Sequence, residues 1–224
     1  MRMSRRGFLT TVGGTSAAVL ASRWAEGQDA PKIRLSACDW SLDATGPGGL
    51  EIAQRVGLEG LEVSTGGPAD VLDIAKPEVR QQYKDNVAKT GVVVSSLAMG
   101  FLNSSPLAKA EKGVQWLEQA AEAAADLNAK VILVAFFGLG DLRSPLVKKL
   151  KADAVDAVVE KLKAAAPKAE KAGVILGIEN TLSGKDNMAI LDRVQSDAVR
   201  IYYDIRNSTD NDYDVPAELR EFGK

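Results

Sequence analysis

Histidine is missing from all 224 residues of this chain, and cysteine occurs once, at Cys38. A single cysteine excludes an intrachain disulfide, and it cannot build a zinc site made of several cysteines. Without histidine, the chain lacks the side chain that most often serves as a metal ligand and as a general base. A metal site within these residues would therefore have to rest on carboxylates.

The chain also has little net charge, because 28 Lys and Arg residues face 30 Asp and Glu residues, which gives a formal charge of −2. The basic residues are spread along the expected helices, except at the extreme N-terminus, so no surface for nucleic acid is indicated. With 46% hydrophobic and 26% charged residues, the composition fits one globular domain with a sizeable core.

Residues 1–30 are predicted to be an export signal and linker outside the fold. Residues 4–9 read S-R-R-G-F-L, a twin-arginine signature, and a mildly apolar stretch follows from Thr10 to Ala21. That stretch is too short for a permanent membrane anchor, and residues 19–21 have the character of a cleavage site. We therefore expect the twin-arginine export machinery as a partner and a periplasmic or extracellular location. A disordered basic start before a short helix is the alternative.

From residue 31 to residue 224, short apolar runs alternate with amphipathic segments, as in a chain of β/α units. Glycines 57, 91 and 173 each come before an expected strand, where helix-ending glycines are typical. Pro167 is expected to kink or divide the fourth helical region. The expected strands are Ile33–Cys38, Gly60–Val63, Val92–Leu97, Val131–Ala135, Val174–Glu179 and Ile201–Asp204. The expected helices are Leu50–Val56, Glu78–Thr90, Leu107–Leu127, Leu146–Ala172, Met188–Gln195 and Pro216–Phe222.

This strict alternation predicts an α/β fold with a parallel sheet and right-handed crossovers. An open six-stranded sheet and a TIM (β/α)8 barrel both satisfy the pattern. Six units of about 32 residues fall short of the roughly 250 residues of a typical barrel. We therefore expect the first six β/α units of a barrel that lacks its last two. Such a chain would expose strand edges, which favours poor solubility or a homo-oligomer.

Two carboxylates stand at the ends of consecutive apolar strands, namely Glu179 and Asp204. The carboxyl ends of parallel strands are where α/β folds build their active sites. Neighbouring strands lie about 4.8 Å apart, so two carboxylates in one layer can share a cation. Each acid has an alternative structural role, because Glu179 could anchor the following loop and Asp204 could pair with Arg206 or a nearby lysine.

Three motifs resemble the sugar phosphate isomerase/epimerase superfamily, the xylose isomerase-like TIM barrels. Residues 166–180 are similar to that family's A-x-x-A-x-x-x-G-V-x-L-x-x-E-N pattern of helix 4 and strand 5. Residues 202–207, Y-Y-D-I-R-N, resemble its strand-6 signature, and residues 57–63 resemble its strand-2 pattern G-x-x-G-x-E. The resemblance runs from about residue 33 to the last residue.

The resemblance implies a divalent metal site, for Mn, Mg, Co or Zn, with Glu179 and Asp204 as two of four ligands. The other two, a histidine and a glutamate of strands 7 and 8, would lie beyond Lys224. Glu179 would also be the acid/base that moves a proton next to a sugar carbonyl, through an enediolate. Asn207 would contact the sugar where many members have histidine, or it serves a turn. Glu62 would bind substrate or support the site.

The resemblance leaves several functions open. A metal-dependent sugar isomerase or epimerase is expected first, and a keto-sugar lyase or hydrolase would need the same chemistry. An exported barrel that binds carbohydrate without turnover is the non-enzymatic alternative. An abasic-site endonuclease fits less well, because that version needs more histidines and a basic groove. Trp40 either stacks on a sugar or packs internally.

Overall fold

The computed structural model describes residues 33–144 and 149–223. The expected export signal at residues 4–9 and its cleavage site lie outside these ranges. Within the described part of the chain, no helix is both long enough and apolar enough to cross a membrane.

Six parallel strands form one sheet in the order in which they occur along the chain. They are β1 (Ser36–Cys38), β2 (Gly60–Ser64), β3 (Val93–Ala98), β4 (Val131–Ala135), β5 (Ile175–Glu179) and β6 (Val199–Ile201). A doubly wound sheet reverses its strand order, whereas this sheet never does, so every crossover runs the same way. This is the winding of a TIM barrel. Among the described residues, β1 pairs only with β2 and β6 only with β5, so the sheet is not closed.

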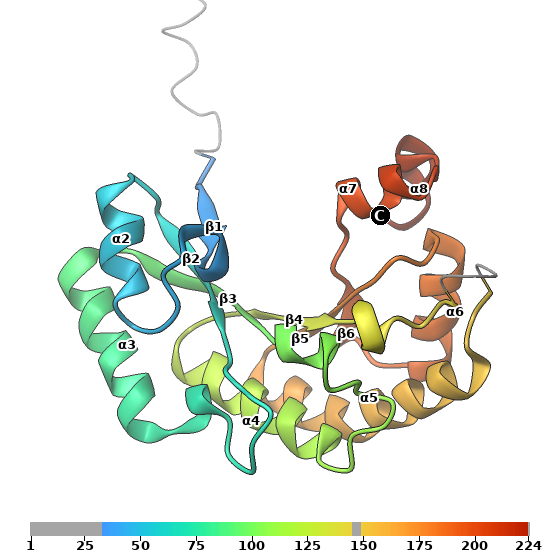
Figure 1. The fold of residues 1–224 in the computed structure, drawn as a ribbon, viewed down its shortest axis with the longest axis horizontal. Helices are drawn as coiled ribbons and strands as arrows, with labels where there is room; N and C mark the ends of the chain where they lie inside the picture. The colour runs from blue at the N-terminus through green and yellow to red at the C-terminus, as the bar shows by residue number, and fades with distance from the viewer. Residues whose placement is uncertain (1–32, 145–148, 224) are drawn as a thin grey trace, which may run out of the picture. The chain divides into compact units, whose positions relative to one another are not determined.

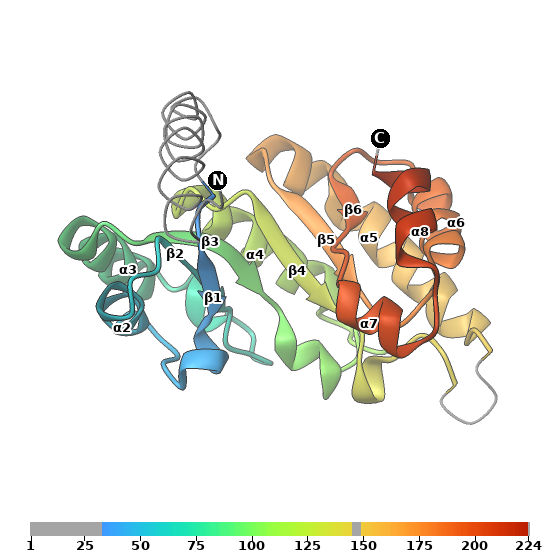
Figure 2. The same cartoon turned by 90° about the horizontal axis from the view of Figure 1, so that it is seen from above.

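The main helices cover one face of this sheet, as one-way winding requires. Helices α3, α4 and α5 lie together along that face in Figure 1, and the strands can be followed from blue β1 to red β6 in Figure 2. Helices α7 and α8 follow β6 and pack on each other. The helices are α2 (Gly49–Arg55), α3 (Pro77–Thr90), α4 (Gly113–Asp126), α5 (Ala152–Ala172), α6 (Gly184–Val194), α7 (Ile205–Asp210) and α8 (Val215–Phe222).

The two faces of the strands differ in residue size, which explains where the core lies. On the helix-covered face, strand residues such as Leu61, Ile132 and Leu176 are fully buried in one large apolar cluster. The opposite face carries a small cluster of Ala98, Leu133 and Ala135. Because side chains alternate across a strand, the large aliphatic residues pack on the helices and small or polar ones face the inside.

The predicted strands are all present, but the first and last are shorter than expected. Ile33 and Leu35 are largely exposed and precede β1. At the other end, β6 stops at Ile201, although the Tyr202 N–H still donates to the Ile178 carbonyl at 2.9 Å. The expectation that Asp204 ends a strand is therefore wrong, because the chain leaves the sheet after Tyr202 and begins α7.

The helix starts differ because neighbouring residues hold the preceding segments as turns. Helix α4 begins at Gly113 and not at Leu107, since the Lys161 ammonium group donates to three carbonyls of the turn before it. Helix α5 begins at Ala152, after an isolated bridge between Arg143 and Leu150. The glycines at 57, 91 and 173 all have positive φ and follow helices, as predicted.

Pro167 lies inside α5 without dividing it, so that part of the prediction is wrong. A proline removes the hydrogen bond to the carbonyl four residues earlier, here that of Lys163. Both residues are exposed, so water can reach this carbonyl. The opposite side of α5 is buried, including Val159, Leu162 and Ala166, and that packing keeps the helix continuous.

Candidate active site

A cavity of about 470 Å³ opens at the carboxyl ends of β2 to β5. Its volume is in the range of small-molecule sites, roughly 300–1,000 Å³. Three aromatic residues contribute to the wall, and Glu179 is the one titratable group among the residues that line it. The lining residues are Trp40, Ser64, Gly66, Ala98, Gly100, Phe101, Asn103, Leu133, Ala135, Phe137 and Glu179.

Glu179 is the last residue of β5, and its carboxyl group is partly buried. Burial raises the pKa of Glu179 to about 7, and the negative charges of Asp204 and then Glu62 add to this effect. A carboxyl group with this pKa is about half ionised near neutral pH, so it can both accept and return a proton.

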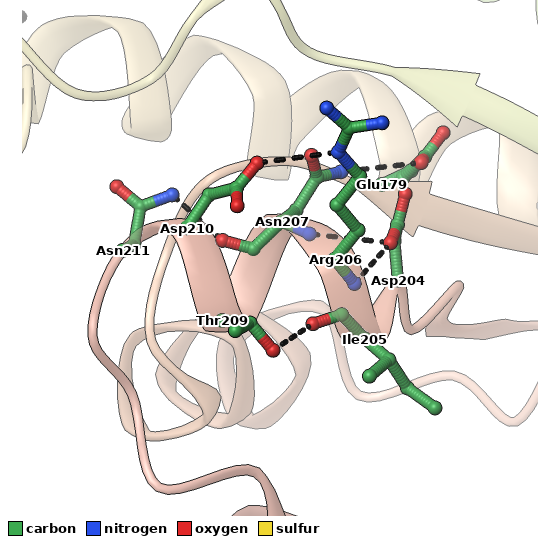
Figure 3. Close-up of polar contacts among 8 residues, drawn as sticks. All are labelled: Glu179, Asp204, Ile205, Arg206, Asn207, Thr209, Asp210 and Asn211. Atoms are coloured by element: carbon green, nitrogen blue, oxygen red, sulfur yellow. Dashed lines mark hydrogen bonds and ion pairs between the residues drawn. The ribbon is translucent and has the colours of Figure 1, made fainter.

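Asp204 lies beside Glu179 and caps the first turn of α7 (Figure 3). Its Oδ1 accepts the N–H groups of Arg206 at 2.7 Å and Asn207 at 3.2 Å. The cap fixes the side chain, which leaves the other oxygen for a further partner. The alternative prediction of an ion pair with Arg206 is not observed, since the Arg206 guanidinium contacts Asp210.

Asn207 completes the group, because its side-chain amide donates to Glu179 Oε1 at 3.4 Å (Figure 3). Its backbone carbonyl accepts a hydrogen bond from the Asn211 side chain at 2.7 Å, which extends α7 into the following turn. The structure thus brings together Glu179, Asp204 and Asn207, three residues that the sequence singled out.

Glu62 lies deeper, inside the curved sheet, and does not line the 470 Å³ cavity. The residue is 4% exposed, and its carboxylate accepts hydrogen bonds from Ser96 Oγ at 2.6 Å, the Tyr202 hydroxyl at 2.9 Å and Cys38 Sγ at 3.4 Å. Burial and the charge of Glu62 raise the pKa of the Cys38 thiol to about 12, so the thiol remains a donor. These donors stabilise a buried carboxylate that has no cationic partner among these contacts.

Tyr202 was not predicted as part of this network, although it lies in a recognised motif. Its ring lies against the α-carbon of Gly177, where an added Cβ would be 3.0 Å from the ring carbon Cδ2. Glycine at this inward-facing position of β5 therefore gives the ring room to reach Glu62. The one usable signal in the sequence is a glycine that interrupts an otherwise aliphatic strand.

The aromatic wall was also missed, apart from Trp40. Phe101 packs edge-on against Trp116, with ring centroids 5.1 Å apart, and Asn103 Oδ1 accepts the Phe137 N–H at 3.0 Å. These contacts hold the loops after β3 and β4 around the cavity. Phe101, Asn103 and Phe137 follow strands, and this position is the one sequence signal that indicates a role in the site.

The donor chemistry of Glu179 and Asp204 fits part of a divalent cation site. Burial is the main reason why the pKa of Glu179 is raised, and repulsion from the adjacent Asp204 carboxylate adds to it; a shared cation would relieve that repulsion. Within the described ranges, no group of three or more His, Cys, Asp or Glu residues is placed to hold a metal ion. Glu179 and Asp204 are the two residues that would hold such an ion.

The fold and this site define a class: an α/β barrel-type protein with a carboxylate-bearing cavity at the carboxyl ends of its strands. The chain belongs to the xylose isomerase-like TIM barrel family, whose sequence profile matches residues 50–224. It is 26% identical over 175 residues to 2-epi-5-epi-valiolone 7-phosphate 2-epimerase from Actinoplanes sp., covering 78% of this chain. The chain spans 62% of the length of that curated relative.

Solved structures share the fold. The structure of L-ribulose 3-epimerase matches with a TM-score of 0.63 at 21% identity, over 85% of this chain and 66% of that one. A xylose isomerase-like TIM barrel protein from Mycobacterium smegmatis in complex with magnesium matches with a TM-score of 0.63 at 15% identity. That match covers 84% of this chain and 70% of the other.

Proposed function

We propose that this protein is a metal-dependent sugar isomerase or epimerase that moves a proton at the carbon next to a carbonyl. The observation that carries the proposal is the position of Glu179, a partly buried carboxyl group on the wall of a sugar-sized cavity, next to Asp204 and in contact with Asn207. The curated relative and the L-ribulose enzyme are epimerases by name, which supports the same kind of reaction here.

Glu179 performs the proton transfer in this proposal. The ionised carboxylate takes the proton from the carbon next to the carbonyl, and the neutral acid returns it on the same face to the neighbouring carbon, which is isomerisation. Epimerisation at one carbon would need a second proton donor on the opposite face of the sugar. The Asn207 amide, which reaches Glu179 Oε1, orients the carboxyl group and presents a hydrogen-bond donor to a sugar hydroxyl. The aromatic wall excludes water, which protects the intermediate from stray protonation.

Glu179 and Asp204 would hold the divalent cation. A bound cation would supply positive charge that stabilises the negative charge developing on the sugar oxygens. Asp204 is suited to be a ligand alone, because its cap to α7 keeps one oxygen occupied and fixes the other. The magnesium complex of the M. smegmatis neighbour supports a hard divalent ion of this kind.

Proton exchange with solvent tests this proposal. D-fructose, D-tagatose and L-ribulose are incubated in D2O with the full chain and Mn²⁺, and NMR follows deuterium at the carbons next to the carbonyl. We expect exchange and a second sugar to appear, and Glu179→Gln to lower the rate at least a hundredfold. Asp192→Asn, a change on the exposed side of α6, is the matched control and should be unaffected.

Turnover that continues in Glu179→Gln would contradict the role of Glu179. Binding of these sugars with neither exchange nor a new product would favour the carbohydrate-binding alternative. Removal of the metal by EDTA should stop exchange, and addition of Mn²⁺ should restore it.

We also propose that the chain is exported, which its S-R-R-G-F-L signature at residues 4–9 supports. Cell fractionation should find the mature protein in the periplasm or the medium. An Arg5→Lys, Arg6→Lys double variant should stay in the cytoplasm, and export of that variant by the same route would contradict the proposal.

A further inference from the structure

A second cavity, of about 460 Å³, adjoins the first at the carboxyl end of β2. Ser64 and Gly66 line both cavities, so the two share a boundary. The second one extends from the loop before α2 to the first turns of α3. Its lining residues are Thr45, Gly46, Pro47, Ser64, Gly66, Asp73, Ile74, Val79 and Tyr83.

The boundary between the two cavities includes Gly66, which is followed in the chain by a second glycine, Gly67. Gly66 and Gly67 have φ angles of +72° and +133°, which disfavour other residues. A Cβ at Gly66 would lie 2.5 Å from Asp73 Oδ2, and a Cβ at Gly67 would lie 2.5 Å from Phe101 Cδ1. Asp73 lines the second cavity and Phe101 lines the first, so the turn at Gly66 and Gly67 lies between a residue of each cavity.

The second cavity has the chemistry of a sugar subsite. Thr45 carries an exposed hydroxyl group, and the exposed Asp73 carboxylate, which accepts a hydrogen bond from Lys76 Nζ at 2.6 Å, can also accept one from a sugar. Pro47 and Val79, which are partly exposed, supply apolar surface for the C–H face of a ring. Convergent polar groups on a mainly apolar wall are typical of small-molecule sites.

We propose that the substrate is a disaccharide or other glycoside whose second sugar unit occupies this second cavity. The reacting sugar lies beside Glu179 in the first cavity, and the glycosidic bond crosses the boundary at Gly66. This inference rests on the proposed function, because it assigns the reacting unit to the Glu179 cavity.

Binding measurements test the inference without requiring turnover. The full chain with Mn²⁺ is titrated by NMR with D-fructose and with three disaccharides that contain it, turanose, lactulose and isomaltulose, which are linked through O3, O4 and O6. At least one disaccharide should bind about ten times more tightly than D-fructose.

Two substitutions locate that gain. Thr45→Trp, at an exposed position in the mouth of the second cavity, should weaken disaccharide binding at least fivefold and D-fructose binding less than twofold. Asp73→Asn should weaken the disaccharide selectively as well. The control Gln82→Trp adds the same side chain to an exposed position of α3 that lines neither cavity, and it should change neither affinity.

The outcomes separate the two proposals. If D-fructose binds but no disaccharide binds more tightly, or if Thr45→Trp weakens both ligands equally, the second subsite is wrong and the proposed function stands. If none of the four sugars binds, the proposed function fails and this inference fails with it. Thermal melting of each variant confirms that it is folded.

Discussion

At the scale of single residues, Glu179 combines two properties that oppose each other. Its burial and the nearby charges of Asp204 and Glu62 disfavour the carboxylate, yet the proposed chemistry needs that carboxylate for half of its cycle. In the metal-free protein, burial and these charges raise the pKa of Glu179 to about 7. When no cation is bound, ionisation of Glu179 lowers the free energy of unfolding.

The raised pKa of Glu179 predicts that the stability of the metal-free protein depends on pH. The folded chain holds the Glu179 proton more tightly than the unfolded chain does, with a pKa of about 7 against 4.5. The stabilisation is therefore fully present below pH 4.5 and is lost as the pH rises through 7. Urea unfolding should give a free energy about 2 kcal/mol lower at pH 8 than at pH 5, given 1.4 kcal/mol per pKa unit and partial exposure.

The variant Glu179→Gln provides the control, since a neutral amide does not titrate. It should lose less stability than the wild type between pH 5 and pH 8, and Mn²⁺ should stabilise the wild type at pH 8 but not the variant. Equal pH profiles for the two proteins would contradict the raised pKa.

At the scale of elements, Asp204 has two separable roles. Its carboxylate caps α7 through two backbone N–H groups, and the same side chain faces Glu179 as a candidate metal ligand. Asparagine is as good an N-cap as aspartate, whereas alanine costs about 1 kcal/mol. Asparagine, however, brings no negative charge to a cation.

We therefore expect Asp204→Asn to keep the unfolding free energy within about 0.5 kcal/mol of the wild type and to weaken Mn²⁺ binding at least tenfold. Asp204→Ala should lose both stability and Mn²⁺ affinity. Calorimetric titration with Mn²⁺ and urea unfolding measure the two effects. An Asn variant that binds Mn²⁺ normally would remove Asp204 from the site.

Pro167 offers a second prediction at this scale. The uninterrupted helix α5 lacks one backbone hydrogen bond at this exposed position. Pro167→Ala restores the N–H donor and removes the ring clash, so it should raise the unfolding free energy by about 1–3 kcal/mol. Lys163→Ala, one turn earlier on the same exposed side, should change it by less than about 0.5 kcal/mol. No gain in Pro167→Ala would show that α5 is already relaxed around the proline.

At the scale of the whole molecule, local patterns predict much of the fold. Aliphatic runs such as Val131–Ala135 coincide with their strand, and the glycines after α3 and α5 end those helices as expected. Contacts between elements that are far apart in the sequence could not be predicted from local patterns. The start of α4 depends on Lys161 from α5, and the end of β6 depends on the cap that Asp204 gives to α7.

The candidate site shows the same division. Glu179 could be predicted because an acid at the end of a parallel strand is often part of an active site. Asp204 was found by the same rule, although it lies three residues beyond β6 and caps α7. Phe101, Phe137 and Tyr202 could not be predicted as site residues, because an aromatic residue after a strand is equally consistent with a role in packing. Loops position Phe101 and Phe137, and Gly177 makes room for Tyr202. Neither arrangement produces a repeating pattern of residues in the sequence.

The hydrogen bond between Tyr202 and Glu62 also bears on how the chain folds. Neighbouring strands pair across short stretches of sequence, but this bond joins residues 140 positions apart and closes a long loop. We expect it to form after the folding transition state. Tyr202→Phe should therefore speed unfolding severalfold and leave the folding rate unchanged in stopped-flow experiments, whereas a slower folding rate would place the bond in the nucleus. A contact that forms last is also the first to open, so the interior of the sheet would loosen at this bond before its strands separate.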